Sequence, residues 1–329
     1  MPFLVSIISE QTIPNYLIMT QYRNKVDGFI FLTTQAMETS QLQTSRSQWL
    51  AEALNIPLQQ IQRVILKEDN YASNLAILQN NIDAKHSYIL NITGGTKILT
   101  LSAYDFFKTH RKIEKIIYLP IAQPSIKTIF PEPAEENLQQ NITLRQYLTA
   151  YGLKYTDEAP KEDYELLKKV FKQYRSKGYN INQLNEDYPE EHKNYFTGGW
   201  FENYVYYKIK QEFQLDDSAI GLNIKIVYHS NSSEPDNEFD IMFVYRYSLY
   251  IFECKASMGK KVTESLLKAI SKLGSVKQNF GLNCKNYLVT LASIPNLELI
   301  NRRAKVAGIK QVIDRSFFAQ NQNFNSIIS

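Results

Sequence analysis

Residues 238–255 read Glu-Phe-Asp-Ile-Met-Phe-Val-Tyr-Arg-Tyr-Ser-Leu-Tyr-Ile-Phe-Glu-Cys-Lys, a pattern that predicts a β-hairpin. The runs 241–245 and 249–252 are β-branched, aromatic and apolar, and Arg246-Tyr247-Ser248 lies between them as the turn. Because side chains alternate along a strand, Glu253 and Lys255 share one face. Asp240 comes beside Glu253 when the hairpin folds back. The stretch therefore predicts two carboxylates and one amine at one point.

Those three groups suit hydrolysis of a phosphodiester. Asp240 and Glu253 supply hard oxygen donors of the kind that hold Mg²⁺ or Mn²⁺. A lysine beside the metal, here Lys255, orients or helps to deprotonate a water for attack on phosphorus. Glu238 shares a strand face with Asp240 and is a candidate accessory ligand. The alternative is a solvated Glu and Lys pair on an edge strand, although the apolar neighbours of Glu253 favour a buried strand.

An upstream helix over 200–213 carries Glu202, and a long helix over about 261–280 follows Lys255. Glu202, Asp240 and Glu253-x-Lys255, in this order of elements, resemble the PD-(D/E)XK nuclease core of restriction endonucleases and Holliday-junction resolvases. The resemblance implies a restriction-endonuclease-like α/β domain with Glu202 as an outer carboxylate near the metal. The alternative for Glu202 is an acid in the first turn of a helix.

The N-terminal half alternates strands with helices. Strands are expected at 3–9, 28–33, 64–66, 88–92 and 116–119, and helices at 15–24, 38–54, about 70–80 and 97–109. Such alternation predicts an α/β fold with a doubly wound, mostly parallel, Rossmann-like sheet. Ligands of such sheets bind at the carboxyl ends of the strands.

Polar residues follow two of these strands. They are Ser9, Glu10, Gln11 and Thr12 after the first strand, and Thr93, Gly94, Gly95, Thr96 and Lys97 after the fourth. The glycines allow backbone amides to approach a phosphate, the helix N-terminus favours anions, and Lys97 adds charge. Neither GxGxxG nor GxxxxGK[ST] is present, so ordinary NAD and ATP sites are not supported. The alternative is a tight turn in which Thr93 or Thr96 caps the helix.

The stretch Asn91-Ile92-Thr93-Gly94-Gly95-Thr96-Lys97 resembles the ligand loop of CARF domains, the CRISPR-associated Rossmann-like sensors. Ser9-Glu10-Gln11-Thr12-Ile13-Pro14-Asn15 resembles the matching loop after strand one, and the resemblance covers about residues 1–145. It implies a homodimer that binds a cyclic oligoadenylate, with cyclic tetra-adenylate as the expected ring, across its two-fold axis.

Three segments follow from these assignments. Residues 1–150 are the expected sensor, 151–195 a charged helical connector with a helix near 162–176, and 196–329 the nuclease domain. In the connector, Lys168, Lys169 and Lys172 form a solvated face or touch nucleic acid. The helix after Lys255 has a basic surface suited to phosphate contacts, made by Lys260, Lys261, Lys268, Lys272 and Lys277.

Composition excludes several classes of protein. The 329 residues carry a formal charge of +4, which permits nucleic acid as a partner. Two cysteines and four histidines show no zinc-ligand spacing, and a reducing cytoplasm is the simplest location. No apolar run approaches the length of a transmembrane helix, so no membrane association is expected. The N-terminus lacks the basic start of a signal peptide and is expected to form a strand.

The two resemblances together cover nearly the whole chain and match the CRISPR ancillary nucleases of type III antiviral immunity. This implies an allosteric, metal-dependent endonuclease that hydrolyses DNA, RNA or both when cyclic oligoadenylate binds. Two alternatives remain: a CARF-containing regulator that binds nucleic acid without cutting it, and an unregulated resolvase or restriction-type nuclease. Ring size, preferred metal, nicking or double-strand cleavage, and degradation of the activator by the sensor stay open.

Overall fold

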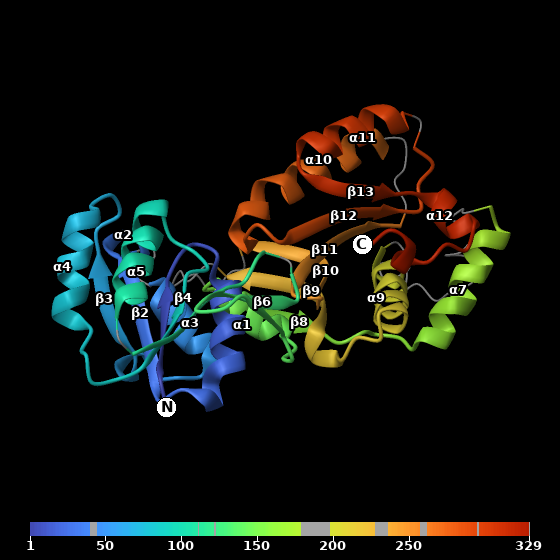
Figure 1. Cartoon of the computed structure of the whole chain (residues 1–329). Helices are drawn as coiled ribbons and strands as arrows, with labels where there is room; N and C mark the ends of the chain where they lie inside the picture. Colours follow the sequence, from blue (N-terminus) through green and yellow to red (C-terminus); the bar gives the residue numbers. More distant parts are fainter. Residues whose placement is uncertain are drawn as a thin grey trace. The chain divides into compact units, whose positions relative to one another are not determined.

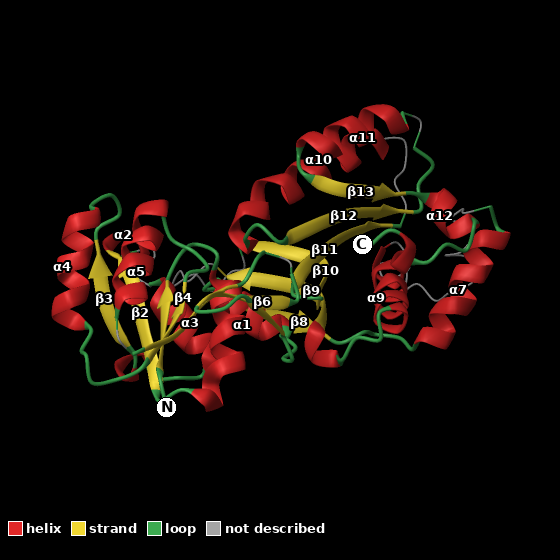
Figure 2. Cartoon of the chain, viewed as in Figure 1, coloured by secondary structure: helices red, strands yellow, loops and turns green. Residues whose placement is uncertain are grey.

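The computed structural model describes residues 1–39, 45–110, 112–121, 123–178, 198–227, 236–256, 262–294 and 296–328. The chain divides into two compact units, one formed mainly by residues 1–154 and the other mainly by residues 155–329. Each is an α/β unit built on its own sheet, as Figures 1 and 2 show. The expected combination of a Rossmann-like and a second α/β domain is confirmed.

The N-terminal sheet has the strand order β3-β2-β1-β4-β5-β6-β7. Its strands are β1 (Phe3–Ile7), β2 (Gly28–Thr34), β3 (Gln62–Leu66), β4 (Tyr88–Asn91), β5 (Ile113–Tyr118), β6 (Ser125–Phe130) and β7 (Ala134–Asn137). The first five strands run parallel, and β6 and β7 add an antiparallel hairpin at one edge. The parallel order places the ends of β1 and β4 next to each other, which brings the two polar loops together.

Helices cover both faces of this sheet. They are α1 (Thr12–Tyr22), α2 (Gln35–Glu38), α3 (Arg46–Leu54), α4 (Tyr71–Asn81), α5 (Lys97–Thr109) and α6 (Leu144–Ala150). In Figure 1, α4 and α5 lie on one face, and α1 and α3 lie on the other. The bounds of α5 agree with the sequence prediction, whereas β1 ends two residues earlier than expected and α1 begins at Thr12.

The prediction of one continuous helix over 38–54 is wrong. The short helix α2 ends at Glu38, and Thr39 has extended backbone angles. Ser45 then caps a new helix, because its hydroxyl accepts a hydrogen bond of 3.0 Å from the backbone N–H of Gln48. The predicted buried face of α3, with Trp49, Leu50 and Leu54, is confirmed.

The C-terminal sheet has the strand order β13-β12-β11-β10-β9-β8. Its strands are β8 (Lys154–Glu158), β9 (Ile220–Val227), β10 (Asn237–Tyr245), β11 (Ser248–Lys255), β12 (Cys284–Thr290) and β13 (Ile309–Ile313). The β9-β10-β11 meander is antiparallel, and β12 and β13 continue it in parallel. Strand β11 therefore lies inside the sheet and not at its edge, so the edge-strand alternative for Glu253 does not hold.

The helices of this unit are α7 (Tyr164–Ser176), α9 (Trp200–Glu212), α10 (Val262–Val276), α11 (Leu297–Val306) and α12 (Arg315–Ala319). Figure 1 shows α10 and α11 on one face of the sheet and α9 on the other. Strand β8 and helix α7 fall within the segment expected to be a connector, and they belong to this unit. Lys260 and Lys261 lie outside the described residues.

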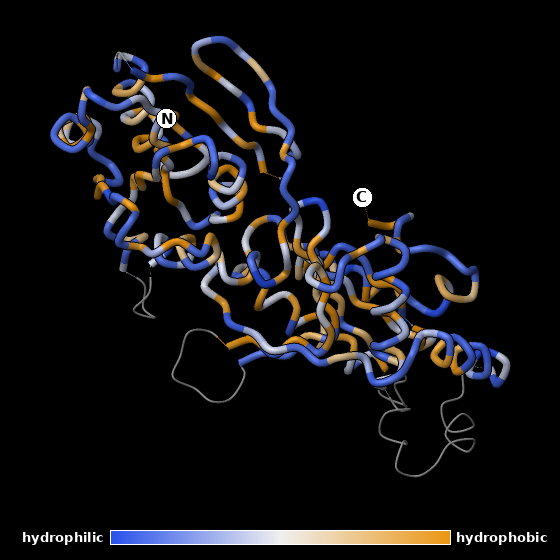
Figure 3. Tube along the Cα trace, turned by 90° about the horizontal axis from the view of Figure 1, so that it is seen from below, coloured by the Kyte–Doolittle hydropathy of each residue, from blue (hydrophilic) through white to orange (hydrophobic). Residues whose placement is uncertain are grey.

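Each unit has its own hydrophobic core. The N-terminal core includes Val5, Leu90 and Phe107, and the C-terminal core is rich in aromatic rings such as Trp200 and Phe252. Figure 3 shows hydrophobic stretches recurring along the trace in both units. Within the described part of the chain, no helix has the length and apolar character needed to cross a membrane.

Candidate functional site

The hairpin that organises the C-terminal unit forms as predicted. Strands β10 and β11 pair from Tyr245 opposite Ser248 to Ile241 opposite Phe252. The turn consists of Arg246 and Tyr247, whose φ angles of 47° and 61° are both positive. Two such residues are typical of the turn that joins strongly twisted strands. The pairing leads directly to Asp240 and Glu253, which lie next along their strands.

Asp240, Glu253 and Lys255 come together at this end of the hairpin. The Lys255 ammonium lies 2.7 Å from Glu253 Oε1 and 3.6 Å from Asp240 Oδ2. The backbone N–H of Cys254 donates a hydrogen bond of 2.5 Å to Asp240 Oδ2. The side chain of Glu253 is 5% exposed, so its charge is held in a sheltered place. The structure thus brings together the three groups that the sequence pattern placed at one point.

Burial and neighbouring negative charges raise the pKa values of carboxyl groups in this cluster. Burial, followed by the charge of Glu253, raises the pKa of Asp240 to about 6. Burial lowers the pKa of the Lys255 ammonium, but the charges of Asp240 and Glu253 outweigh it and raise the pKa above its usual value. The lysine therefore stays charged at neutral pH, while the carboxylates gain from any further positive charge nearby.

Glu202 approaches the same cluster from the first turn of α9. Burial, followed by the charge of Asp240, raises the pKa of Glu202 to about 7. Glu238 is exposed on β10 and is the weakest of the named influences on Glu202. Among the described residues, no group of three or more His, Cys, Asp and Glu side chains lies close enough to form a metal site. The carboxylate pair of Asp240 and Glu253 is the donor set available here.

Sequence reasoning missed one member of this site. Lys272 of α10 was expected on a basic surface, yet its ammonium lies 2.8 Å from Glu253 Oε2. Its position on the following helix was known from the sequence, but no local pattern distinguishes it from the other lysines of that helix. Only the packing of α10 on the sheet reveals the contact.

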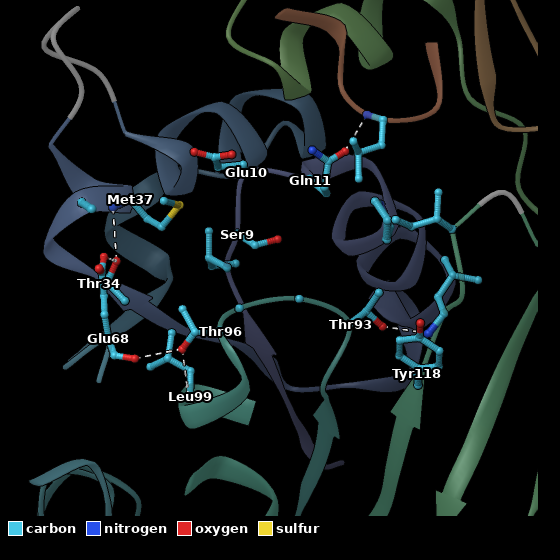
Figure 4. A pocket seen from close by; sticks show the side chains of 18 residues that line it. Ser9, Glu10, Gln11, Thr34, Met37, Glu68, Thr93, Thr96, Leu99 and Tyr118 are labelled. Carbon is cyan, nitrogen blue, oxygen red and sulfur yellow. Dashed lines mark hydrogen bonds between the residues drawn. The ribbon is translucent and has the colours of Figure 1, made fainter. Parts of the chain in front are cut away.

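The second site is a cavity of about 760 Å³ at the carboxyl edge of the N-terminal sheet (Figure 4). Seven of the predicted ligand residues line it: Ser9, Glu10, Gln11, Thr93, Gly94, Gly95 and Thr96. Thr12 and Lys97 are not among the described residues that line it. Thr12 is buried at the start of α1, and Lys97 is exposed at the start of α5.

Hydrogen bonds hold the loop after β4 in its shape. The Thr93 hydroxyl accepts a bond of 2.7 Å from the backbone N–H of Leu119. The Thr96 hydroxyl caps α5 by accepting a bond from Leu99 N–H and donates one of 2.9 Å to the backbone oxygen of Glu68. The capping role considered for Thr96 is therefore present, and it coexists with the cavity.

Gly94 and Gly95 are required by the backbone of this loop. Their φ angles are +146° and +77°, which side chains rarely allow. A Cβ on Gly95 would lie 2.6 Å from Ile7 Cγ2, and one on Gly94 would lie 2.7 Å from Ser9 Oγ. The Ser9 hydroxyl, labelled in Figure 4, is buried and has no hydrogen-bond partner among the described residues. The loop is thus closely packed against the end of β1.

Further lining residues come from strands whose ends the sequence did not single out. Thr34 ends β2, Glu68 follows β3 and Tyr118 ends β5, and Met37 of α2 also lines the cavity. Thr34 donates a hydrogen bond of 3.1 Å to Glu68 Oε1. The rule that ligands bind at the carboxyl ends of parallel strands would have indicated Thr34 and Glu68, had it been applied to β2 and β3.

Two family models match the chain. The Card1 CARF domain matches residues 3–147, and the Card1-like endonuclease domain matches residues 189–317. No curated protein matches the chain significantly.

Solved structures share the fold over nearly the whole length. Can2 from Sulfobacillus thermosulfidooxidans, solved in complex with cyclic tetra-adenylate, is 22% identical, with a TM-score of 0.77 and coverage of 99% of both chains. Protein VC1899 from Vibrio cholerae is 19% identical, with a TM-score of 0.74 over 97% of this chain and 95% of that chain. A type III CRISPR defence DNA nuclease activated by cyclic oligoadenylate is 16% identical, with a TM-score of 0.60 over 89% of this chain and 46% of its own.

At these identities the structural likenesses establish the fold, and the family models establish the two domains. The ligand-sized cavity lies within the first matched segment, and the Asp240, Glu253 and Lys255 cluster lies within the second. The chain therefore combines a segment that matches the Card1 CARF domain with one that matches the Card1-like endonuclease domain.

Proposed function

We propose that this protein is a metal-dependent nuclease of type III CRISPR defence, switched on by cyclic oligoadenylate. The observation that carries the proposal is the convergence of Asp240, Glu253 and Lys255 at one end of the hairpin, inside the endonuclease domain. A nuclease without regulation would have no use for the second, ligand-sized cavity of the CARF domain.

Asp240 and Glu253 are the residues that would hold Mg²⁺ or Mn²⁺, and the donor set fits such an ion. Mg²⁺ is usually bound by one or two carboxylates together with substrate phosphates and waters, so a pair of carboxylates is sufficient. The raised pKa of Asp240 reflects burial and the charge of Glu253, and a cation held by these two carboxylates would lower that pKa. When bound, the ion supplies an activated water and neutralises charge on the phosphate.

The remaining chemistry belongs to the side chains. Lys255 keeps its proton and stabilises the negative charge that develops on the phosphate oxygens. It also orients the attacking water by donating a hydrogen bond. Glu202, with a pKa of about 7, is suited to accept a proton from that water near neutral pH, directly or through a second water. Glu238, which is exposed, would act at most as an accessory group.

In the CARF domain, the cavity would take one part of a cyclic tetra-adenylate shared by two copies of the chain. Can2, which has the same fold, was solved with this nucleotide. The described lining includes the carboxylates of Glu10 and Glu68 but no Lys or Arg. Phosphates would therefore be met by backbone N–H groups at the starts of α1 and α5, and adenine amino groups by the carboxylates.

Activation requires that the nucleotide bind the active arrangement more tightly than the inactive one. To shift the ratio of active to inactive protein from 1:99 to 99:1, the nucleotide must bind the active arrangement more favourably by about 5.5 kcal/mol. A homodimer supplies two cavities that face one ring, and it is the arrangement in which one ligand can act on both nuclease domains. DNA and RNA are both candidate substrates, because basic residues such as Lys277 would contact the phosphate backbone and not the bases.

The test is a cleavage assay with Mn²⁺ on supercoiled plasmid and on single-stranded RNA, with and without cyclic tetra-adenylate. We expect cleavage only when the nucleotide is present. Glu253→Gln should lower the rate at least about a hundredfold while leaving nucleotide binding intact, since removal of a catalytic group costs this much or more. Glu264→Gln is the control, because Glu264 pairs with Lys268 on the surface of α10.

Each other outcome decides against part of the proposal. Cleavage without the nucleotide would identify an unregulated nuclease. Nucleotide binding without cleavage of either substrate would identify a regulator. Undiminished cleavage by purified Glu253→Gln protein would disprove the site.

A further inference from the structure

Glu253 is held by two lysines from different elements. Lys255, two residues along β11, contacts Oε1 at 2.7 Å, and Lys272 from α10 contacts Oε2 at 2.8 Å. Both oxygens of a nearly buried carboxylate are therefore engaged by ammonium groups. Since Lys255 also lies 3.6 Å from Asp240, its charge is shared, and Lys272 supplies the second positive charge that the two carboxylates need.

The surroundings of Lys272 hold it at this position. Its ammonium lies 5.4 Å from the centre of the Phe239 ring, a cation–π distance. Phe239 is fully buried and packs edge-on against Phe280, with ring centres 5.6 Å apart. The Lys272 side chain is 34% exposed, so one side of it still faces solvent. It is therefore sheltered by the protein on one side and open to solvent on the other.

Lys268 provides a contrast on the same helix. It lies one turn earlier, is 78% exposed and pairs with Glu264 of its own helix. A surface pair of this kind contributes little and makes no contact with the carboxylate cluster. The two lysines therefore differ in surroundings while they share a helix, a side-chain type and a charge.

Two positive groups compete for one carboxylate in the proposed nuclease. A divalent cation held by Asp240 and Glu253 would be repelled by an ammonium on the same Glu253 side chain. The metal-free protein, in turn, needs a counter-ion there, because an unpaired charge at 5% exposure is costly. Lys272 satisfies that need and has a solvent-facing side toward which it can move.

We propose that Lys272 is the counter-ion of Glu253 in the metal-free protein and gives up this carboxylate when a divalent cation binds. Its ammonium then contacts a phosphate of the nucleic-acid substrate. The inference rests on the proposed function, since it assumes that Asp240 and Glu253 hold a cation. It assigns to Lys272 one role in the metal-free protein and another when a cation is bound. A lysine of a general basic surface would not change its role in this way.

The test compares Lys272→Met with Lys268→Met in the full-length protein. Mn²⁺ affinity is measured by electron paramagnetic resonance without substrate. Affinity for a fluorescein-labelled single-stranded RNA and a DNA duplex is measured by anisotropy with Ca²⁺ and cyclic tetra-adenylate present. Methionine keeps an unbranched apolar side chain of similar length and removes the charge. Folding of each variant is checked by circular dichroism and by its affinity for cyclic tetra-adenylate.

We expect Lys272→Met to bind Mn²⁺ roughly threefold to tenfold more tightly and nucleic acid at least about threefold more weakly. Lys268→Met should leave Mn²⁺ affinity unchanged, and Lys272→Arg should restore both affinities toward those of the unmodified protein. A merely structural role would weaken both affinities together.

Different results would contradict the counter-ion role, the phosphate contact and the metal site. Equal or weaker Mn²⁺ binding by Lys272→Met would overturn the counter-ion role, and unchanged nucleic-acid affinity would overturn the phosphate contact. If the unmodified protein binds no Mn²⁺, or if Glu253→Gln leaves its Mn²⁺ affinity unchanged, the proposed metal site itself fails.

Discussion

The side-chain amide of Asn91, at the end of β4, donates a hydrogen bond of 2.8 Å to Asn15 Oδ1, in α1. Asn15 in turn donates one of 2.9 Å to the backbone oxygen of Ile7, and Asn91 Oδ1 accepts one of 2.9 Å from Thr93 N–H. Both asparagines are fully buried. This chain of bonds ties the end of β1, the start of α1 and the loop after β4 into one unit beneath the cavity.

Replacing Asn91 by Ala should destabilise the CARF domain by about 1–3 kcal/mol, because buried partners lose their hydrogen bonds. It should also weaken binding of cyclic tetra-adenylate, since the loop that begins at Thr93 loses its anchor. Urea unfolding followed at Trp49, in a Trp200→Phe background, and calorimetric titration measure the two effects. Asn81→Ala, at an exposed site, should cost less than about 0.5 kcal/mol. Equal effects at both sites would contradict this account.

Gly95→Ala should weaken activator binding by about tenfold or more. The alanine would be strained by the positive φ of +77°, and its Cβ would clash with Ile7. Gly178→Ala separates these effects, because Gly178 has a φ of +63° and no atom within 4 Å of an added Cβ. We expect a loss of about 1 kcal/mol of stability at Gly178 and no change in nucleotide affinity. A Gly95→Ala protein with unchanged affinity would show that the loop tolerates the side chain.

Lys97→Ala should weaken binding of cyclic tetra-adenylate by roughly threefold to tenfold, and less at high salt. Lys97 begins α5 and is exposed, so its charge acts on the phosphates through solvent. Lys108→Ala, near the other end of the same helix, is the matched control, and neither change should alter Mn²⁺ affinity. An unaltered dissociation constant for Lys97→Ala would remove this residue from the ligand site.

The metal-free endonuclease domain should lose stability as the pH rises from 5 to 7.5. Glu202 and Asp240 have pKa values of about 7 and about 6 in the folded protein, above the ordinary values of 4.5 and 3.8. The folded state therefore holds protons that the unfolded state releases in this range, and folding becomes less favourable as they leave. Protonation of Glu202 and Asp240 contributes its full stabilisation below the pKa values that these groups have in the unfolded chain. This contribution to the free energy of unfolding is lost above pH 7.

Urea unfolding in EDTA, followed at Trp200 in a Trp49→Phe background, should show a decrease on the order of 1–2 kcal/mol between pH 5 and 7.5. Glu202→Gln should make the decrease smaller, because one of the two groups is gone. Saturating Mn²⁺ should also reduce it, since a bound cation favours the ionised carboxylates. A flat profile in the unmodified protein would mean that these carboxylates keep ordinary pKa values.

Much of the fold was predictable because its signals are local. The two β-branched, aromatic and apolar runs at 241–245 and 249–252, with a turn between them, predicted the hairpin β10–β11. Side-chain alternation along the strand then placed Glu253 and Lys255 on one face. The glycine pair before α5 indicated a tight turn, and both glycines have the positive φ angles that other residues rarely adopt. Where local signals conflict, as in the Ser- and Thr-rich residues before Arg46, the prediction of a continuous helix was wrong because Ser45 caps a new one.

The sequence by itself determined which residue types are present and on which strand, loop or helix they lie. The tertiary structure decided which of them meet. Asn15 and Asn91 are 76 residues apart, and Glu253 and Lys272 are 19 apart on a strand and a helix. Propensity and alternation act over a few neighbouring residues, whereas these contacts depend on strand order and on how each helix packs against its sheet. That is why Lys272 looked like one lysine of a basic surface until the packing of α10 brought it to Glu253.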